Sequence, residues 1–238
     1  MPNEVDYQMM RKYAQNGNLT SEIYKTEDGT SVVKKKDYNP ESGLIETSYE
    51  VLSNADQQEI KYSQGKKVLD KILQGTGDTI NSLYDSEEQL VRRDTVIKLD
   101  QSTIEEIFGQ RGLIYKREVY PERKESVVNV YKKGDLLFKQ TFKFGSLSEV
   151  TEYTGGKTIA RVIKFAKDGS AEVRSLRLDN TLETVKEYNS KGEVTRTLNY
   201  AKDGTTLENE LAGGTPDTFD DRLFTNVNVQ TLIEEDAK

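Results

Sequence analysis

Few residues in this sequence could carry out catalysis. None of the 238 residues is His or Cys, which removes the commonest general base, the thiolate nucleophile and the usual ligands of transition metals. The 41 Asp and Glu residues could include a carboxylate pair of the kind that glycosidases use, but nothing in their spacing singles one out. Asp217, Asp220 and Asp221 could share a cation, although an exposed acidic linker is the commoner meaning of such a cluster. We therefore predict no catalytic residue, no cofactor and no metal site. The enzymatic alternative needs a carboxylate-based or Tyr/Lys-based site that the sequence does not locate.

One segment is similar to the end of a phosphate-binding loop. Residues 154–158 read TGGKT, but the full pattern requires a glycine five positions before Gly156, and Thr151 stands there. The residues that follow alternate between apolar and polar types, which is typical of a strand and not of the helix that such a loop precedes. We therefore interpret this segment as a hairpin turn.

The elements that would position any site repeat along the chain. Residues 188–208, YNSKGEVTRTLNYAKDGTTLE, contain one arrangement twice: a tyrosine, a polar turn with Lys and Gly, then alternating Thr and apolar residues. Glycine supplies the positive φ that tight turns need, and period-two alternation indicates a β-strand. An aromatic residue precedes a turn glycine by three to five positions at Tyr24–Gly29, Tyr38–Gly43, Tyr62–Gly65, Tyr131–Gly134, Tyr153–Gly156, Phe165–Gly169, Tyr188–Gly192 and Tyr200–Gly204.

These landmarks keep a regular spacing. They fall 11 to 14 residues apart in the first part of the chain and 11 or 12 apart in the second, so that a hairpin repeats every 22 to 25 residues. The pattern predicts a mainly β protein: an antiparallel meander of repeated β-hairpins, forming an elongated sheet or a solenoid-like body, with one or two short helices and an extended C-terminal tail. An ordinary antiparallel domain with regular strand lengths is the alternative. The landmarks are Tyr13, Tyr24, Tyr38, Tyr49, Tyr62, Leu73, Tyr84, Tyr131, Phe142, Tyr153, Phe165, Leu176, Tyr188 and Tyr200.

Three stretches depart from this pattern. Ser102 precedes Glu105 by the spacing of a capping box, and Gly109 could end a helix near 103–108. The N-terminal residues also have helical spacing, while residues 66–75 suit a helix or a strand equally well. We expect five parts: an N-terminal segment (1–19) with helical spacing, β-hairpin repeats (20–100), an irregular or helical insertion (101–119), further β-hairpin repeats (120–208) and an acidic docking tail (209–238).

The C-terminal tail combines acidic and apolar residues. From Glu208 to Lys238, acids outnumber bases by eight to two, which accounts for most of the net charge of −7. A tail that only increases solubility would not contain so many apolar residues. They predict a segment that docks on its own chain or on a neighbour. The predicted partner-docking residues are Phe219, Leu223, Phe224, Val227, Val229, Leu232 and Ile233.

Composition narrows the range of partners. Apolar residues make up 34% and charged residues 32% of the chain, which leaves much surface for little core. The nearly neutral body and the acidic tail do not suit a nucleic-acid partner. We see no signal peptide and no apolar run long enough to span a bilayer, and therefore expect a location in the cytoplasm or within a particle, with no membrane partner.

The doubled unit in residues 188–208 resembles the YD (Rhs-type) repeats and the MORN-variant hairpin repeats. The resemblance covers roughly residues 20–65 and 120–208. It departs from the YD pattern because Tyr is followed by Asp only at Tyr84 and the Arg-Leu pair typical after the YD glycine is missing. These families imply scaffolds or shells of stacked hairpins. We therefore expect a non-enzymatic structural or assembly protein, a β-repeat component of a phage particle or another bacterial assembly, that contacts copies of itself or other subunits. A protein- or glycan-binding β-repeat module is the alternative.

Overall fold

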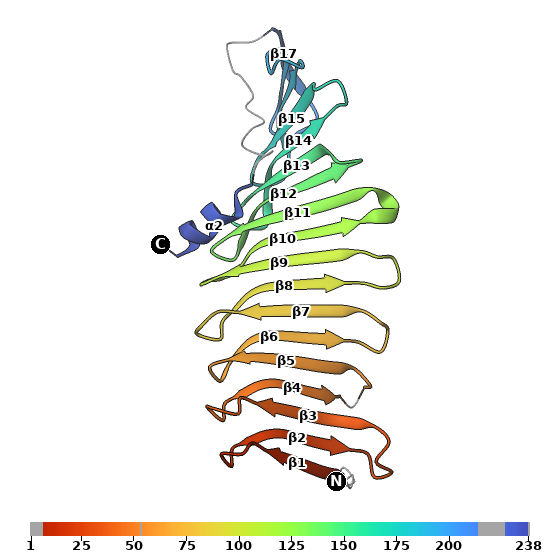
Figure 1. The fold of residues 1–238 in the computed structure, drawn as a ribbon. Coiled ribbons are helices and arrows are strands. Elements are labelled where there is room, and N and C mark those ends of the chain that lie inside the picture. The colour runs from red at the N-terminus through yellow and green to blue at the C-terminus, as the bar shows by residue number, and fades with distance from the viewer. Residues whose placement is uncertain (1–6, 53, 214–226, 238) are drawn as a thin grey trace. The chain divides into compact units, whose positions relative to one another are not determined.

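The computed structural model describes residues 7–52, 54–213 and 227–237. The chain divides into two compact units, residues 1–104 (unit 1) and residues 105–238 (unit 2). Within each unit, antiparallel strands follow one another in chain order, so the predicted meander of β-hairpins is confirmed (Figure 1).

Unit 1 is a single layer of eight strands within its described residues (Figure 1). Each strand pairs antiparallel with the next one along the chain. Both faces of this layer are open, because no helix or second sheet of the described residues of unit 1 covers either face. The strands are β1 (Gln8–Tyr13), β2 (Leu19–Lys25), β3 (Val32–Tyr38), β4 (Ile45–Val51), β5 (Gln57–Ser63), β6 (Lys66–Leu73), β7 (Thr79–Tyr84) and β8 (Leu90–Val96).

Unit 2 contains ten strands and a C-terminal helix among its described residues. Strands β10 to β18 pair antiparallel in chain order, and β9, which begins just before the boundary between the units, pairs with β10. The elements are β9 (Thr103–Gly109), β10 (Gly112–Tyr120), the 3₁₀ turn η1 (Pro121–Arg123), β11 (Glu125–Lys132), β12 (Asp135–Lys143), β13 (Ser146–Thr154), β14 (Thr158–Phe165), β15 (Ala171–Leu176), β16 (Leu182–Tyr188), β17 (Val194–Tyr200), β18 (Leu207–Ala212) and α2 (Val229–Asp236).

Most of the landmark residues lie at β-bulges. The pairing register shifts directly before Tyr13, Tyr38, Tyr62 and Tyr84, which lie at or next to the ends of alternate strands in unit 1. A bulge bends its strand and increases the local twist before the chain turns back. The regular spacing of tyrosines is therefore the spacing of bulge-and-turn units. In unit 2 the register shifts directly before Tyr131, Phe142, Tyr153, Leu176, Tyr188 and Tyr200.

The predicted helix near residues 103–108 is wrong, because these residues form strand β9. The oxygen Oγ of Ser102, the expected cap, is buried and makes no hydrogen bond. Pairing with β10 gives the backbone of β9 the partners that a helix would have supplied internally. The irregular or helical insertion expected at 101–119 is thus part of the regular meander.

Two further helix assignments are also decided by the structure. Residues 66–75, which suited either type, form strand β6. In the N-terminal segment, residues 8–13 form β1, so the helical alternative is wrong there, while residues 1–6 lie outside the described residues. In each case pairing with a neighbouring strand outweighs a weak helical periodicity.

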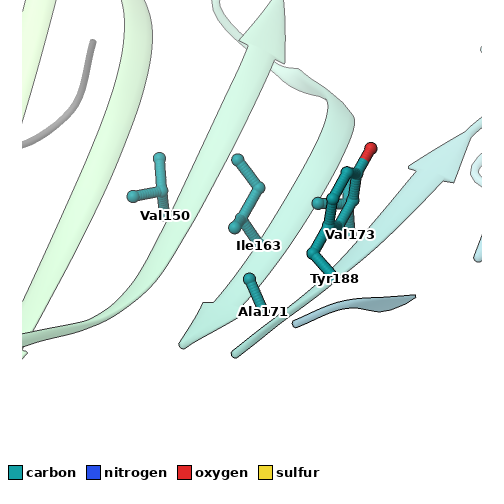
Figure 2. Close-up of a cluster of buried hydrophobic side chains, with 5 residues drawn as sticks. All are labelled: Val150, Ile163, Ala171, Val173 and Tyr188. Atoms are coloured by element: carbon teal, nitrogen blue, oxygen red, sulfur yellow. The ribbon is translucent and has the colours of Figure 1, made fainter. Parts of the chain in front are cut away.

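Among the described residues, the buried apolar side chains all belong to unit 2. One cluster joins four neighbouring strands, β13 to β16, through Val150, Ile163, Val173 and Tyr188 (Figure 2). A second cluster contains Ile114, Tyr115, Val128 and Val130. In the described part of unit 1 the fully buried residues are instead polar: Ser21, Glu22, Asp56, Ser82 and Ser102.

Candidate functional site

The C-terminal tail docks on its own unit. Val227, Val229, Leu232 and Ile233, four of the predicted docking residues, pack against the second apolar cluster of unit 2. Helix α2 begins at its cap Asn228, whose Oδ1 accepts a hydrogen bond from the backbone N of Gln230 at 3.0 Å. These four apolar side chains are therefore used within the chain. The other predicted docking residues, Phe219, Leu223 and Phe224, lie outside the described residues.

The end of helix α2 is held by polar contacts. Asp236 is buried, and its Oδ2 accepts a hydrogen bond from the backbone N of Arg111 at 3.0 Å in the β9–β10 turn. Glu235 forms an exposed ion pair with Lys132, with Oε2 3.6 Å from Nζ. Exposed pairs contribute little to stability, so the buried Asp236 is the contact that fixes the end of the helix.

A cavity of about 820 Å³ lies in unit 2 at the turns that follow β12, β14 and β16. We call it the turn pocket. Its apolar floor contains Leu147, Phe165, Ala171 and Tyr188. Ala171 and Tyr188 belong to the apolar cluster in Figure 2, and the other two pack against it, so the floor is the edge of a rigid core.

Three exposed lysines line the turn pocket: Lys143 is the last residue of β12, and Lys167 and Lys191 lie in the turns after β14 and β16. No Asp or Glu is among the residues that line this pocket. The nearby Asp168 lines an adjoining cavity on the other side of its turn, where it accepts hydrogen bonds from the backbone N and the hydroxyl of Ser170. These hydrogen bonds, first that of the hydroxyl, lower the pKa of Asp168.

Phe144 lies on the pocket wall in an unfavourable conformation. Its φ is +54° and the following Gly145 has a φ of +81°, so both residues of this two-residue turn are left-handed. Such turns prefer Asn or Asp before Gly, and a bulky residue at positive φ is strained. The ring is nevertheless 76% exposed, so burial does not compensate for the strain. Strained, exposed aromatic residues are typical of binding surfaces.

The tyrosines on the open layer of unit 1 have structural partners. The hydroxyl of Tyr38 donates a hydrogen bond to Oε2 of Glu22 at 2.9 Å, while Arg11 Nε lies 3.0 Å from Oε1. Burial, followed by the hydrogen bond to Glu22, raises the pKa of Tyr38 to about 12. The same hydrogen bond is the main cause of the lowered pKa of Glu22. This group stabilises strand pairing in place of an apolar core and offers no free acid or base.

Two strands expose their full length. All six residues of β1 are exposed, including Met9 and Met10, and β1 pairs with β2 on one side. All six residues of β18 are also exposed, including Leu207 and Leu211, and β18 pairs with β17. Each strand thus presents apolar side chains beside an edge for which the described residues of its own unit supply no second pairing strand.

The described residues contain neither a metal-ligand cluster nor a membrane-spanning helix. No three Asp or Glu side chains among them gather as a metal site would require. Nor does any helix in the described part of the chain have the length and apolar character to cross a membrane. The sequence interpretation missed the turn pocket, although the interval of 24 residues between its three lysines was a signal. That interval equals one hairpin repeat, which places the lysines at or just after the ends of alternate strands.

Comparisons with known proteins add little about function. No protein-family model and no curated protein matches this sequence. Among solved structures, the chain is similar to the crystal structure of TcdB2-TccC3, at 11% sequence identity and a TM-score of 0.22. The match covers 84% of this chain and 14% of that chain. So low a TM-score carries no argument about activity or partners.

Proposed function

We propose that this protein is a non-enzymatic structural protein that associates through its exposed strands, as a β-repeat component of a larger assembly such as a phage particle or a bacterial complex. The observation that carries the proposal is the exposure of apolar side chains on strand β1 of unit 1. The described part of unit 1 buries no apolar side chain, whereas Met9, Met10 and Tyr13 are about half exposed on strand β1. An open edge with apolar side chains gains stability when another strand pairs with it.

The surface of the chain supports this proposal. All six residues of β1 in unit 1 and all six of β18 in unit 2 are exposed, which leaves both strands available for burial between subunits. We propose copies of this chain as the first partners, because β1 carries the exposed Lys12 and β18 the exposed Glu208, while Arg11 and Glu210 are already paired with Glu22 and Arg196. A basic edge and an acidic edge attract each other, and unlike edges join head to tail.

The turn pocket favours a second function, that of a protein-binding module. It has an apolar floor, three lysines and no acidic lining residue. The two functions are compatible, because the pocket lies on turns of unit 2 and the exposed β1 lies in unit 1.

The test is the mass of the purified full-length chain, measured by light scattering at increasing concentration. We expect the mass to rise above that of a monomer, and the double variant Met9→Lys/Met10→Lys to remain monomeric. Both side chains are about half exposed, so the variant should fold. The control is Leu99→Lys, because Leu99 is 94% exposed but lies outside β1 and β18. A wild-type chain that stays monomeric at every concentration contradicts the proposal, as does assembly that both variants leave unchanged.

A further inference from the structure

The turn pocket combines three features in one place. Three lysines at or just after the ends of β12, β14 and β16 line it together with apolar floor residues and the strained, exposed Phe144. Two strands separate each of these strand ends from the next, and neighbouring strands are about 4.8 Å apart, so successive strand ends are about 10 Å apart. The pocket therefore carries a positively charged residue from each of three successive strand ends, beside one exposed aromatic ring.

We propose that the turn pocket binds an acidic, proline-rich peptide segment of a partner protein in the polyproline II conformation. A polyproline II helix has three residues per turn and rises about 3.1 Å per residue, so every third side chain points the same way at intervals of about 9 Å. This interval matches the spacing of the strand ends beside the three lysines. A β-strand does not fit as well, because its side chains alternate and every third one points to the opposite face.

The walls of the pocket suit the rest of such a peptide. Proline rings pack on exposed aromatic side chains, and polyproline II segments are commonly recognised by grooves lined with aromatic residues. Phe144 supplies an exposed ring here, whereas Phe165 is partly buried and Tyr188 is buried in the pocket floor. Carboxylates at every third position meet Lys143, Lys167 and Lys191, which have no ion pair among the described residues. This proposal rests on the second proposed function, that of a protein-binding module, and does not depend on the assembly function.

The probe is a fluorescent peptide with four Glu-Pro-Pro repeats, titrated with the full-length protein. We expect saturable binding that weakens with salt, and Lys167→Glu to weaken it by about tenfold or more. The matched control is Lys202→Glu. Residues 166–169 and 201–204 both read AKDG, but Lys202 does not line the pocket. The control should change the affinity less than twofold, while Phe144→Ala should weaken binding without changing the charge.

A second peptide of the same composition, with its four Glu in one block, tests the spacing. We expect it to bind more weakly than the repeated peptide. Equal binding of the two peptides overturns the proposal, as does an equal loss with Lys202→Glu or an absence of binding at millimolar concentration. Light scattering on Lys167→Glu keeps the two proposals distinguishable, because loss of peptide binding with unchanged assembly supports a separate site. If the variant abolishes assembly, a second copy of this chain occupies the pocket and the proposal is wrong.

Discussion

The buried carboxylate of Asp236 lies directly over Gly109, where a side chain on residue 109 would clash with it. The same carboxylate accepts the hydrogen bond from Arg111 N at 3.0 Å. Gly109 has no positive φ, so its backbone does not require glycine. Glycine is needed because helix α2 ends against the β9–β10 turn. A side chain at position 109 would occupy the space that Asp236 fills when the tail docks.

We predict that Gly109→Ala weakens the docking of helix α2 and destabilises unit 2 by about 1–3 kcal/mol, as overpacking against a buried group does. Hydrogen exchange of residues 229–236 and urea unfolding measure the two effects. The control is Gly75→Ala, because Gly75 has no positive φ and an added Cβ would make ordinary contacts at 3.8 and 3.9 Å. Unchanged protection of α2 in Gly109→Ala would contradict the importance of this contact.

A second glycine lies where two neighbouring turns of unit 2 meet. Gly204 has a φ of +70°, and an added Cβ would lie 2.8 Å from Leu182 N and 2.9 Å from Thr181 Cβ. Arg177 joins the same two turns by donating hydrogen bonds to the backbone oxygens of Leu182, at 2.6 Å, and Tyr200, at 2.7 Å. The turns are therefore packed too closely to admit a methyl group.

We predict that Gly204→Ala lowers the unfolding free energy by about 2–4 kcal/mol, through backbone strain and the clash together. Gly134→Ala is the control for strain alone, because Gly134 has a φ of +85° and an added Cβ would meet nothing within 4 Å. Thermal melts of both variants measure the difference. Equal losses would show that the contact between the turns adds nothing to stability.

Ala55 offers the opposite change, since it has a φ of +66° without being glycine. We predict that Ala55→Gly stabilises unit 1 by about 1 kcal/mol, because the steric cost of a Cβ in the left-handed region disappears. Ala14→Gly is the control, at a turn position without positive φ, where glycine should destabilise by about 0.5–1 kcal/mol. Urea unfolding followed by circular dichroism gives both values, and a loss of stability in Ala55→Gly would refute the argument.

Acid should weaken the turn that contains Asp203. Hydrogen bonds from the Thr206 hydroxyl and from the backbone N of Thr206 and Thr205 lower the pKa of Asp203 to about 2. A carboxyl whose pKa is lower in the folded state stabilises the fold above its unfolded pKa of about 4, and this effect is lost as the pH falls toward 2. We predict that Asp203→Asn lowers the melting temperature near pH 6 and that the difference from wild type vanishes near pH 2. The control Lys202→Gln changes no carboxyl group, so its melting temperature should differ from that of wild type by the same amount at every pH. If the difference for Asp203→Asn is also independent of pH, the prediction is contradicted.

The sequence allowed most of the strands to be predicted because their signal is local. Tyr38, Tyr62 and Tyr84 stand at bulges beside turns, and an aromatic residue before a Gly-bearing or polar turn is visible without knowledge of the partner strand. The helix prediction for residues 103–108 failed because the contact that decides this segment's structure is not local. Ile104, Ile107 and Phe108 fit a helical period, and only pairing with β10, which the local pattern does not contain, selects a strand.

The candidate sites depended on contacts that no local pattern contains. The tail residues were selected by composition, and the structure places Leu232 and Ile233 on the chain's own core. Docking of the tail on a neighbouring molecule stays a prediction. The turn pocket was missed because Lys143, Lys167 and Lys191 read as solvated turn residues when each is taken alone. Only the lateral stacking of alternate turns brings them around one cavity.

Because unit 1 is a single layer, its number of hairpins can change during evolution without disrupting the rest of the layer. Each strand there contacts its sequence neighbours and no shared core, so a duplicated or deleted hairpin leaves the remaining pairings intact. Every added pair of strands widens the layer by about 10 Å. The width of such a layer is set by the number of hairpins that the gene encodes. Adding a hairpin does not require the existing strands to pack differently.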